Sequence, residues 1–227
     1  MLGNEALARG LYEAGVKLMS SYPGTPSTEI TEFAANYDDI YCEWAPNEKV
    51  ATEVAFGASL RGVRSATAMK HVGLNVAADP LFTLSYTGVN GGMVIIVADD
   101  PAMHSSQNEQ DSRHYAIASK VPMLEPADSG EAKEFIKEAY RISEEFDTPV
   151  LLRMCTRIAH SQSMVELGER EEIALGKYEK NPQTFIMVPA NAKARHPFVE
   201  ERIAKLTEIA ESSSLNRVEI VSSERGI

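Results

Sequence analysis

The chain has 227 residues, 44% of them hydrophobic, and is long enough for one large α/β domain with an appendage or for two small domains. Its formal net charge of -11 at pH 7, with no compensating basic run, excludes the electrostatic pattern of a nucleic-acid-binding protein. Cys42 and Cys155 belong to no CxxC pair and no apolar run approaches membrane length, so we expect a soluble, reduced, cytoplasmic protein without a cysteine-based metal site.

Short apolar runs alternate with helical patterns from residue 4 to residue 154. This alternation predicts βαβ units, and hence a doubly wound, mostly parallel α/β sheet of about six strands with helices on both faces. The expected strands are Val16–Ser20, Ile40–Trp44, Ser65–Met69, Gly92–Ala98, Val121–Leu124 and Pro149–Met154. The expected helices are Asn4–Glu13, Pro26–Asn36, Glu48–Arg61, Asn75–Thr87 and Gly130–Phe146.

The composition changes near residue 165 toward Glu, Lys, Arg and Asn, with one short apolar island and a helical stretch at Pro197–Ala210. We therefore expect a domain over residues 1–165 and a helical or irregular appendage over 166–227. The appendage is predicted to be a linker toward a further domain of a larger enzyme.

Glu48 stands at the start of a helix whose apolar face is built of small residues such as Ala51 and Ala55. A carboxylate in this first turn should point toward a packed interface, where it could take part in chemistry. The alternative is a purely structural role, in which Glu48 complements the positive end of the helix while Asn47 caps it.

Polar loops follow the other early strands, and in a parallel sheet these loops share one edge. In Tyr22–Ser27, Thr25 is expected to cap a helix that Pro26 begins, leaving amides free for an anion, although a simple cap explains the same residues. Lys70 and His71 follow the third strand. Because Thr25, Glu48, Lys70 and His71 should meet at one edge, we expect a functional cleft there.

The loop from Asp99 to His114 is the longest between two elements, and long polar loops are often functional. Its acidic and histidine side chains match no recognised metal-ligand spacing, so an ordinary surface loop is the other interpretation. The sequence contains neither GxGxxG nor the GxxxxGK[ST] motif, which excludes the common dinucleotide and nucleoside-triphosphate sites.

Three segments carry a family resemblance: Tyr22–Ser27, Asn47–Ala51 and Met69–Pro80. In this order they resemble the N-terminal, pyrimidine-binding domain of indolepyruvate:ferredoxin oxidoreductase α subunits, and the resemblance covers about residues 1–165. The wider family is the thiamine diphosphate-dependent 2-oxoacid:ferredoxin oxidoreductases. Its pyrimidine-binding domain has the doubly wound sheet expected above.

The resemblance implies that Glu48 is catalytic and hydrogen-bonds N1′ of the cofactor's aminopyrimidine, which favours the tautomer that removes the proton from thiazolium C2. It also implies that Gly24 and Thr25 contact the cofactor, that Thr25 lies near the substrate carboxylate, and that Lys70 and His71 line the substrate side.

In pyruvate-specific relatives, an arginine from the loop after the fourth strand meets the substrate carboxylate. Glu109 falls near that place here, and Arg113, a few residues later, is the candidate substrate residue.

Other family motifs are missing from the chain. It has no GDG motif, whose domain carries the diphosphate and Mg²⁺, and no cysteine-rich iron–sulfur motif. The resemblance therefore implies thiamine diphosphate shared with a domain or subunit outside this chain, which would also hold Mg²⁺ and the iron–sulfur clusters. The expected partners are that domain, a 2-oxoacid, CoA and ferredoxin, in a homo- or hetero-oligomer without nucleic acid or membrane.

The expected activity is the oxidative decarboxylation of arylpyruvates such as indolepyruvate to acyl-CoA. Two other functions stay open from the sequence. The chain could belong to a non-oxidative thiamine diphosphate-dependent decarboxylase, or it could be a non-catalytic assembly module that keeps the fold.

Overall fold

Six parallel strands form one sheet in the order β2-β1-β3-β4-β6-β5. The computed structural model describes residues 1–178, 180–216 and 218. The strands are β1 (Leu18–Ser21), β2 (Tyr41–Trp44), β3 (Ser65–Lys70), β4 (Met93–Asp99), β5 (Met123–Leu124) and β6 (Val150–Cys155). All six expected strands are confirmed, with shifts of one or two residues at their ends.

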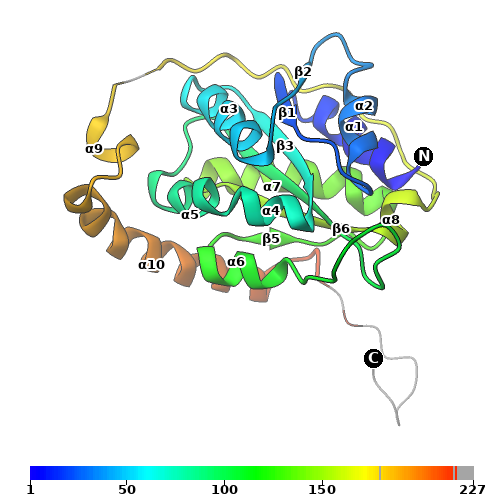
Figure 1. The fold of residues 1–227 in the computed structure, drawn as a ribbon. Helices are drawn as coiled ribbons and strands as arrows, with labels where there is room; N and C mark the ends of the chain where they lie inside the picture. The colour runs from blue at the N-terminus through cyan, green and yellow to red at the C-terminus, as the bar shows by residue number, and fades with distance from the viewer. Residues whose placement is uncertain (179, 217, 219–227) are drawn as a thin grey trace.

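Helices cover both faces of the sheet (Figure 1). One face packs on α1 (Gly3–Glu13), α2 (Thr28–Ala34), α7 (Ser129–Phe146) and α8 (Thr156–His160). The other packs on α3 (Glu48–Leu60), α4 (His71–Val76), α5 (Ala78–Thr87) and α6 (Arg113–Ser119). Every residue of β4 is buried, as expected for a central parallel strand with helices on both sides. The doubly wound α/β prediction is confirmed.

The segment after α8 crosses the amino-terminal end of the sheet as an extended strap. Two of the hydrogen bonds that hold its backbone join it to other parts of the backbone: the Glu171 amide donates to the Glu13 carbonyl at 2.8 Å, and the Gly176 amide donates to the Gly62 carbonyl at 3.1 Å. At the second point the two chains approach so closely that a Cβ on Gly62 would lie 2.6 Å from the Gly176 Cα. Glycine at this crossing is therefore a steric requirement.

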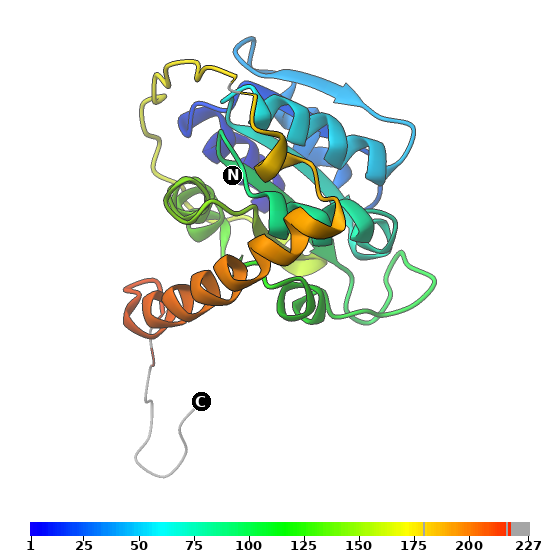
Figure 2. The same ribbon diagram turned by 90° about the vertical axis from the view of Figure 1, so that its left-hand side faces the viewer.

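The chain then forms α9 (Pro182–Phe185) and α10 (Pro189–Ser212). Figure 2 shows α10 as one long helix along the side of the molecule. Leu206 joins the core cluster that contains Phe135 and Ile142 of α7. An unpaired edge strand attracts other chains, and α10 lines a groove together with the β5 residues Met123 and Leu124, so it shields this edge.

Two arginines of α10 attach it to the carboxyl-terminal ends of α5 and α7. Arg202 is 3% exposed and donates to the carbonyls of Ser85 and Asp147, both at 2.6 Å. Arg195 donates to the carbonyl of Tyr86 at 2.8 Å and to the Asp147 carboxylate at 2.9 Å. The last carbonyls of a helix lack partners within it, so α10 satisfies groups that α5 and α7 leave open.

Three helix predictions were wrong in their bounds. The helix expected over Pro26–Asn36 is Thr28–Ala34. The single helix expected over Asn75–Thr87 is divided into α4 and α5 near Ala77. Pro80 has no amide hydrogen to donate to the carbonyl four residues earlier, which explains the division. The helix expected to start at Pro197 starts at Pro189, and Pro197 lies inside it. Both residues are prolines, and the sequence signal for a first helical position could not distinguish them. Across the described residues, every helix is too short or too polar to cross a lipid bilayer.

We expect Arg202→Met to lower the free energy of unfolding by about 2–4 kcal/mol, because the carbonyls of Ser85 and Asp147 lose a charged donor while an apolar stem is kept. The matched control is Lys205→Met on the same helix. The Lys205 side chain is 59% exposed and pairs only with Glu201 among the described residues, so its loss should cost less than about 0.5 kcal/mol. Urea denaturation measures both, and equal effects would contradict this role of Arg202.

Candidate functional site

The loops at the carboxyl ends of β1, β3 and β4 meet at one edge of the sheet. The register pairs Lys70, the last residue of β3, with Ala98 of β4, and Ser21, the last residue of β1, with Trp44 of β2. The segments that follow these residues therefore start side by side. In open α/β sheets this edge is where ligands bind.

Glu48 begins α3 and is 9% exposed. Asn47 accepts a hydrogen bond from the Val50 amide at 3.0 Å and so provides the helix cap itself. The Glu48 side chain rests on Gly73 of α4, where an added Cβ would lie 2.5 Å from Glu48 Oε1 and 2.7 Å from its Cγ. Only glycine leaves room for the carboxylate at this place.

Four acidic side chains of the described residues are buried: Glu13, Glu48, Asp99 and Asp100. A buried carboxylate is costly unless hydrogen bonds or ion pairs compensate it. Within the described chain the carboxylate of Glu48 accepts no hydrogen bond and forms no ion pair, whereas the other three are compensated. The partners are Arg9, Lys133 and Gly168 for Glu13, Arg153 and Ser112 for Asp99, and Ser105, Ser106 and Thr156 for Asp100.

Lys70 connects the loop after β1 with the loop after β4. Its stem packs against Gly24, where a Cβ would lie 3.2 Å from both Cγ and Cδ of the lysine. Its ammonium donates to the Ser105 carbonyl at 2.9 Å. An ammonium has three donors, and this is the one hydrogen bond of Lys70 Nζ among the described residues, so donors remain for an acidic ligand.

His71 is fully buried. Its Nε2 lies 3.1 Å from the Asn108 carbonyl, and because a carbonyl only accepts, Nε2 carries the hydrogen. Nδ1 is also buried and has no hydrogen-bond partner within the described chain. One hydrogen bond, to the loop after β4, therefore sets the tautomer of the ring.

Thr25 does not cap a helix, contrary to the expectation, and Pro26 does not begin one. The helix starts at Thr28, because residues 24–28 form a closed turn first. The Ser27 amide and hydroxyl donate to the Gly24 carbonyl at 2.8 and 2.7 Å, and the Gly24 amide donates to Thr28 Oγ1 at 2.8 Å. Thr25 is exposed at the tip of this turn, on the loop that contacts Lys70 through Gly24.

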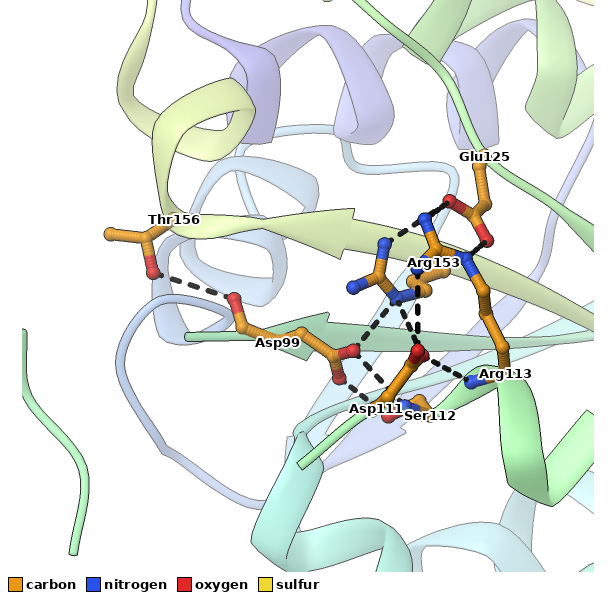
Figure 3. A network of polar contacts seen from close by, with 7 residues as sticks. All are labelled: Asp99, Asp111, Ser112, Arg113, Glu125, Arg153 and Thr156. Carbon is orange, nitrogen blue, oxygen red and sulfur yellow. Dashed lines mark hydrogen bonds and ion pairs between the residues drawn. The ribbon is translucent and has the colours of Figure 1, made fainter. Parts of the chain in front are cut away.

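Arg113 lies in a different cluster, drawn in Figure 3. Its guanidinium donates to both carboxylate oxygens of Glu125 at 2.5 and 2.6 Å, and Arg153 joins Glu125 to the buried Asp99. The hydrogen bonds to Glu125 raise the pKa of Arg113 above its ordinary value. The structure thus brings Gly24, Lys70 and His71 together, but Arg113 would have to leave Glu125 to meet a substrate.

Asp100 was not selected from the sequence. Its carboxylate accepts hydrogen bonds from the Ser105 amide, Ser106 Oγ and Thr156 Oγ1, each at 2.7 Å. Burial by itself would raise the pKa of Asp100, but these hydrogen bonds, that of Ser106 foremost, outweigh it and hold the pKa well below its usual value. The sequence signal was weak, because an Asp-Asp-Pro run resembles any exposed turn. No group of three or more His, Cys, Asp or Glu side chains could hold a metal ion in the part of the chain described.

Comparison with known proteins gives a consistent result. The sequence model of the family described as pyruvate flavodoxin/ferredoxin oxidoreductase, thiamine diphosphate-binding, matches residues 9–219. The indolepyruvate oxidoreductase subunit IorA of Archaeoglobus fulgidus is 45% identical over 236 residues, covering 100% of this chain and 38% of that protein. The IorA subunit of Methanothermobacter marburgensis is 50% identical over 222 residues, covering 96% of this chain and 36% of that protein.

The chain therefore spans little more than a third of the length of these curated relatives. Among solved structures, a 2-oxoglutarate:ferredoxin oxidoreductase from Magnetococcus marinus with 2-oxoglutarate, coenzyme A and succinyl-CoA bound is similar, with a TM-score of 0.77 and 18% identity. The similarity covers 98% of this chain and 46% of that one. At this identity it shows the fold alone.

Gly73→Ala should lower the free energy of unfolding by about 1–3 kcal/mol, because the methyl group meets the Glu48 side chain. Gly57→Ala is the control, since a Cβ there has no neighbour within 4 Å, and it should stabilise α3 by up to about 1 kcal/mol. Adding Glu48→Ala to Gly73→Ala should recover part of the loss, as measured by urea denaturation. A Gly73→Ala protein as stable as the parent would contradict this contact.

The stabilisation by Asp100 should depend on pH. Because its pKa is lowered in the folded protein, the stabilisation is present above the ordinary carboxyl pKa of about 3.9 and is lost as the pH falls below that value. The difference in free energy of unfolding between the parent chain and Asp100→Asn should therefore shrink between pH 7 and pH values below about 3.9. A difference that stays constant over this range would show that the charge of Asp100 does not matter.

Proposed function

The chain belongs to the pyruvate flavodoxin/ferredoxin oxidoreductase family as its thiamine diphosphate-binding domain, and from this premise we propose that it is the pyrimidine-binding portion of a 2-oxoacid:ferredoxin oxidoreductase. The complete enzyme would decarboxylate 2-oxoacids oxidatively to acyl-CoA, with ferredoxin as electron acceptor. Arylpyruvates such as indolepyruvate are the proposed substrates, because the IorA relatives are 45–50% identical, whereas a 2-oxoglutarate synthase subunit KorA is 25% identical.

The observation that supports this proposal most is the unpaired, buried carboxylate of Glu48. An aminopyrimidine ring offers a nitrogen that can share a proton with a carboxyl group, and Glu48 is the buried acid with capacity left for such a partner. Bound thiamine diphosphate would supply a thiazolium carbon acid, whose deprotonated form is the nucleophile for the 2-oxo group. Glu48 would hold the proton shared with N1′ of the pyrimidine at a carboxylate oxygen, and the absence of a side chain at Gly73 leaves room for that carboxylate.

The other site residues are proposed with the roles that the family resemblance implies. Gly24 and Thr25 line the cofactor side. Thr25, Lys70 and His71 face the substrate, and the free donors of Lys70 suit a carboxylate. Arg113 is proposed for the substrate as well, with Glu125 as the group that a substrate carboxylate would replace.

The remaining parts of the site would lie on another domain or subunit, which carries the diphosphate, Mg²⁺ and the iron–sulfur clusters. Residues 1–165 are proposed as the pyrimidine-binding domain and 166–227 as the segment leading to the next part of the enzyme, in a homo- or hetero-oligomer. Both cysteines are free, which is compatible with the proposed reducing cytoplasm. The names of the relatives support an oxidoreductase and lend no support to a non-oxidative decarboxylase.

Glu48→Gln tests the proposal in an anaerobic mixture of this chain with the cofactor-binding half of the enzyme. The measurement is indolepyruvate- and CoA-dependent reduction of an artificial electron acceptor. Loss of the shared proton should lower kcat by at least about 100-fold. Because the buried carboxylate of Glu48 has no partner in the described chain, the variant should be at least as stable as the parent.

The control is Lys49→Gln, the next residue, whose side chain is 44% exposed and pairs with Asp79. It should keep nearly full activity. Full activity of Glu48→Gln would exclude the assigned role of Glu48. If the parent mixture decarboxylates the 2-oxoacid but reduces no acceptor, the enzyme is the non-oxidative type, and a mixture that does neither would favour an assembly module.

A further inference from the structure

The loop between β4 and α6 carries the groups that hold Lys70 and His71. Ser105 provides the carbonyl for the Lys70 ammonium and Asn108 the carbonyl for His71 Nε2. These are backbone groups, so their positions depend on the course of the loop and not on a side-chain rotamer. Whatever fixes the loop therefore also fixes the two side chains at the edge of β3.

Asp100 is the group that fixes this loop. One of its carboxylate oxygens accepts from the Ser105 amide and from Ser106 Oγ, and the other accepts from Thr156 Oγ1 at the start of α8. Asp100 is 1% exposed and thus connects the loop to the end of β6 through the protein interior. The same peptide region that bonds to Asp100, at Ser105, presents its carbonyl to Lys70.

The loop is closed a second time by Glu109, whose carboxylate accepts from the Ala102 amide at 2.6 Å. Ala102 and Met103 both have positive φ, at 65° and 55°, a conformation that costs non-glycine residues free energy. Such a backbone persists only where other contacts hold it. Asp100 and Glu109 supply these contacts from either side of the turn.

We propose that Asp100 is a positioning residue of the site: by holding the loop, it sets the tautomer of His71 and the place of the Lys70 ammonium. The link between Asp100 and catalysis rests on the proposed function, because that function assigns Lys70 and His71 to the substrate. Its structural part is independent of that function, because it concerns the loop and the imidazole alone.

The first test is Asp100→Asn in the 227-residue chain, observed by long-range ¹⁵N–¹H correlation spectra of the five histidines, with His71 identified by a His71→Gln variant. In the parent chain Nε2 of His71 should be the protonated nitrogen. In Asp100→Asn the signal should move toward an average of both tautomers, and the Ser105 amide should exchange with solvent at least about tenfold faster. A merely structural role would lower stability without changing the tautomer.

The matched control is Asp38→Asn, at an exposed carboxylate without a hydrogen bond or ion pair among the described residues. It should leave the His71 spectrum unchanged. If Asp100→Asn does not fold, Ser106→Ala and Thr156→Val each remove one hydrogen bond of Asp100 and should each shift the His71 signal partway. An unchanged His71 signal in the folded variants would overturn the proposal.

The second test is kinetic and uses the assembled enzyme. Asp100→Asn should raise KM for the 2-oxoacid about tenfold, as expected when a charged donor such as Lys70 is displaced, while kcat falls less. A tautomer shift in Asp100→Asn with a Glu48→Gln enzyme of full activity would retain the positioning role and reject the proposed function. If the His71 tautomer is unchanged in Asp100→Asn and the Glu48→Gln enzyme is inactive, the positioning role is rejected and the proposed function is retained.

Discussion

The parallel ladder between β3 and β4 determines which loops meet at the candidate site. Ser65–Lys70 pairs in register with Met93–Ala98, so the strands end together and Lys70-His71 starts beside Asp99-Asp100. A slip by one residue would exchange the two faces of a strand. In β3 it would move Ala66 and Ala68 away from the cluster formed with α1 and α7, and Met69 away from the cluster formed with α4 and α5. Core packing thus protects the alignment on which the site depends.

The carboxyl-terminal part of the described chain contributes to the same rigidity from the opposite edge. Backbone hydrogen bonds join the strap to Glu13 at the end of α1 and to Gly62 before β3. The helix α10 lies along the short strand β5. Arg202 is expensive to bury, and burial lowers its pKa to about 10. The interior position is tolerated because the guanidinium serves two helix ends at once. The described residues 166–178 and 180–216 therefore pack on the sheet and its helices through these contacts.

The fold could be predicted from the sequence to a greater extent than the site. The strands could be predicted because β4 and its neighbours are continuous apolar runs, and their parallel arrangement follows from their alternation with helices. Glu48, Lys70 and His71 could be placed at one edge because that edge follows from the topology alone. Thr25 was misplaced because Ser27 and Thr28 close a turn before the helix, a local hydrogen-bonding choice that the Thr-Pro pattern does not reveal.

Asp99 and Asp100 could not be found because their partners Arg153 and Thr156 are 54 and 56 residues away. Only the folded sheet brings β4 and β6 together. Arg113 was predicted as a substrate residue from its place in the loop after β4. In the structure its side chain binds Glu125, which follows β5. The contacts of Asp99 and Asp100 with β6 and α8 join segments that are distant in the chain, and the contact of Arg113 joins α6 to the end of β5, 12 residues later. A single sequence carries no signal for either kind of pair.

The contrast between Glu48 and the other buried acids bears on which function the fold serves. A protein that only needed this sheet for assembly would have no physical reason to bury a carboxylate without a partner, since glutamine or an apolar residue would cost less. The chain also keeps Gly73 opposite Glu48, giving up helix propensity in α4 to leave the carboxylate room. The unpaired buried carboxylate and the glycine in α4 both lower stability. Both are explained if a hydrogen-bonding partner from outside the described chain binds Glu48. An aminopyrimidine is such a partner, and the family to which the chain belongs binds it as part of thiamine diphosphate.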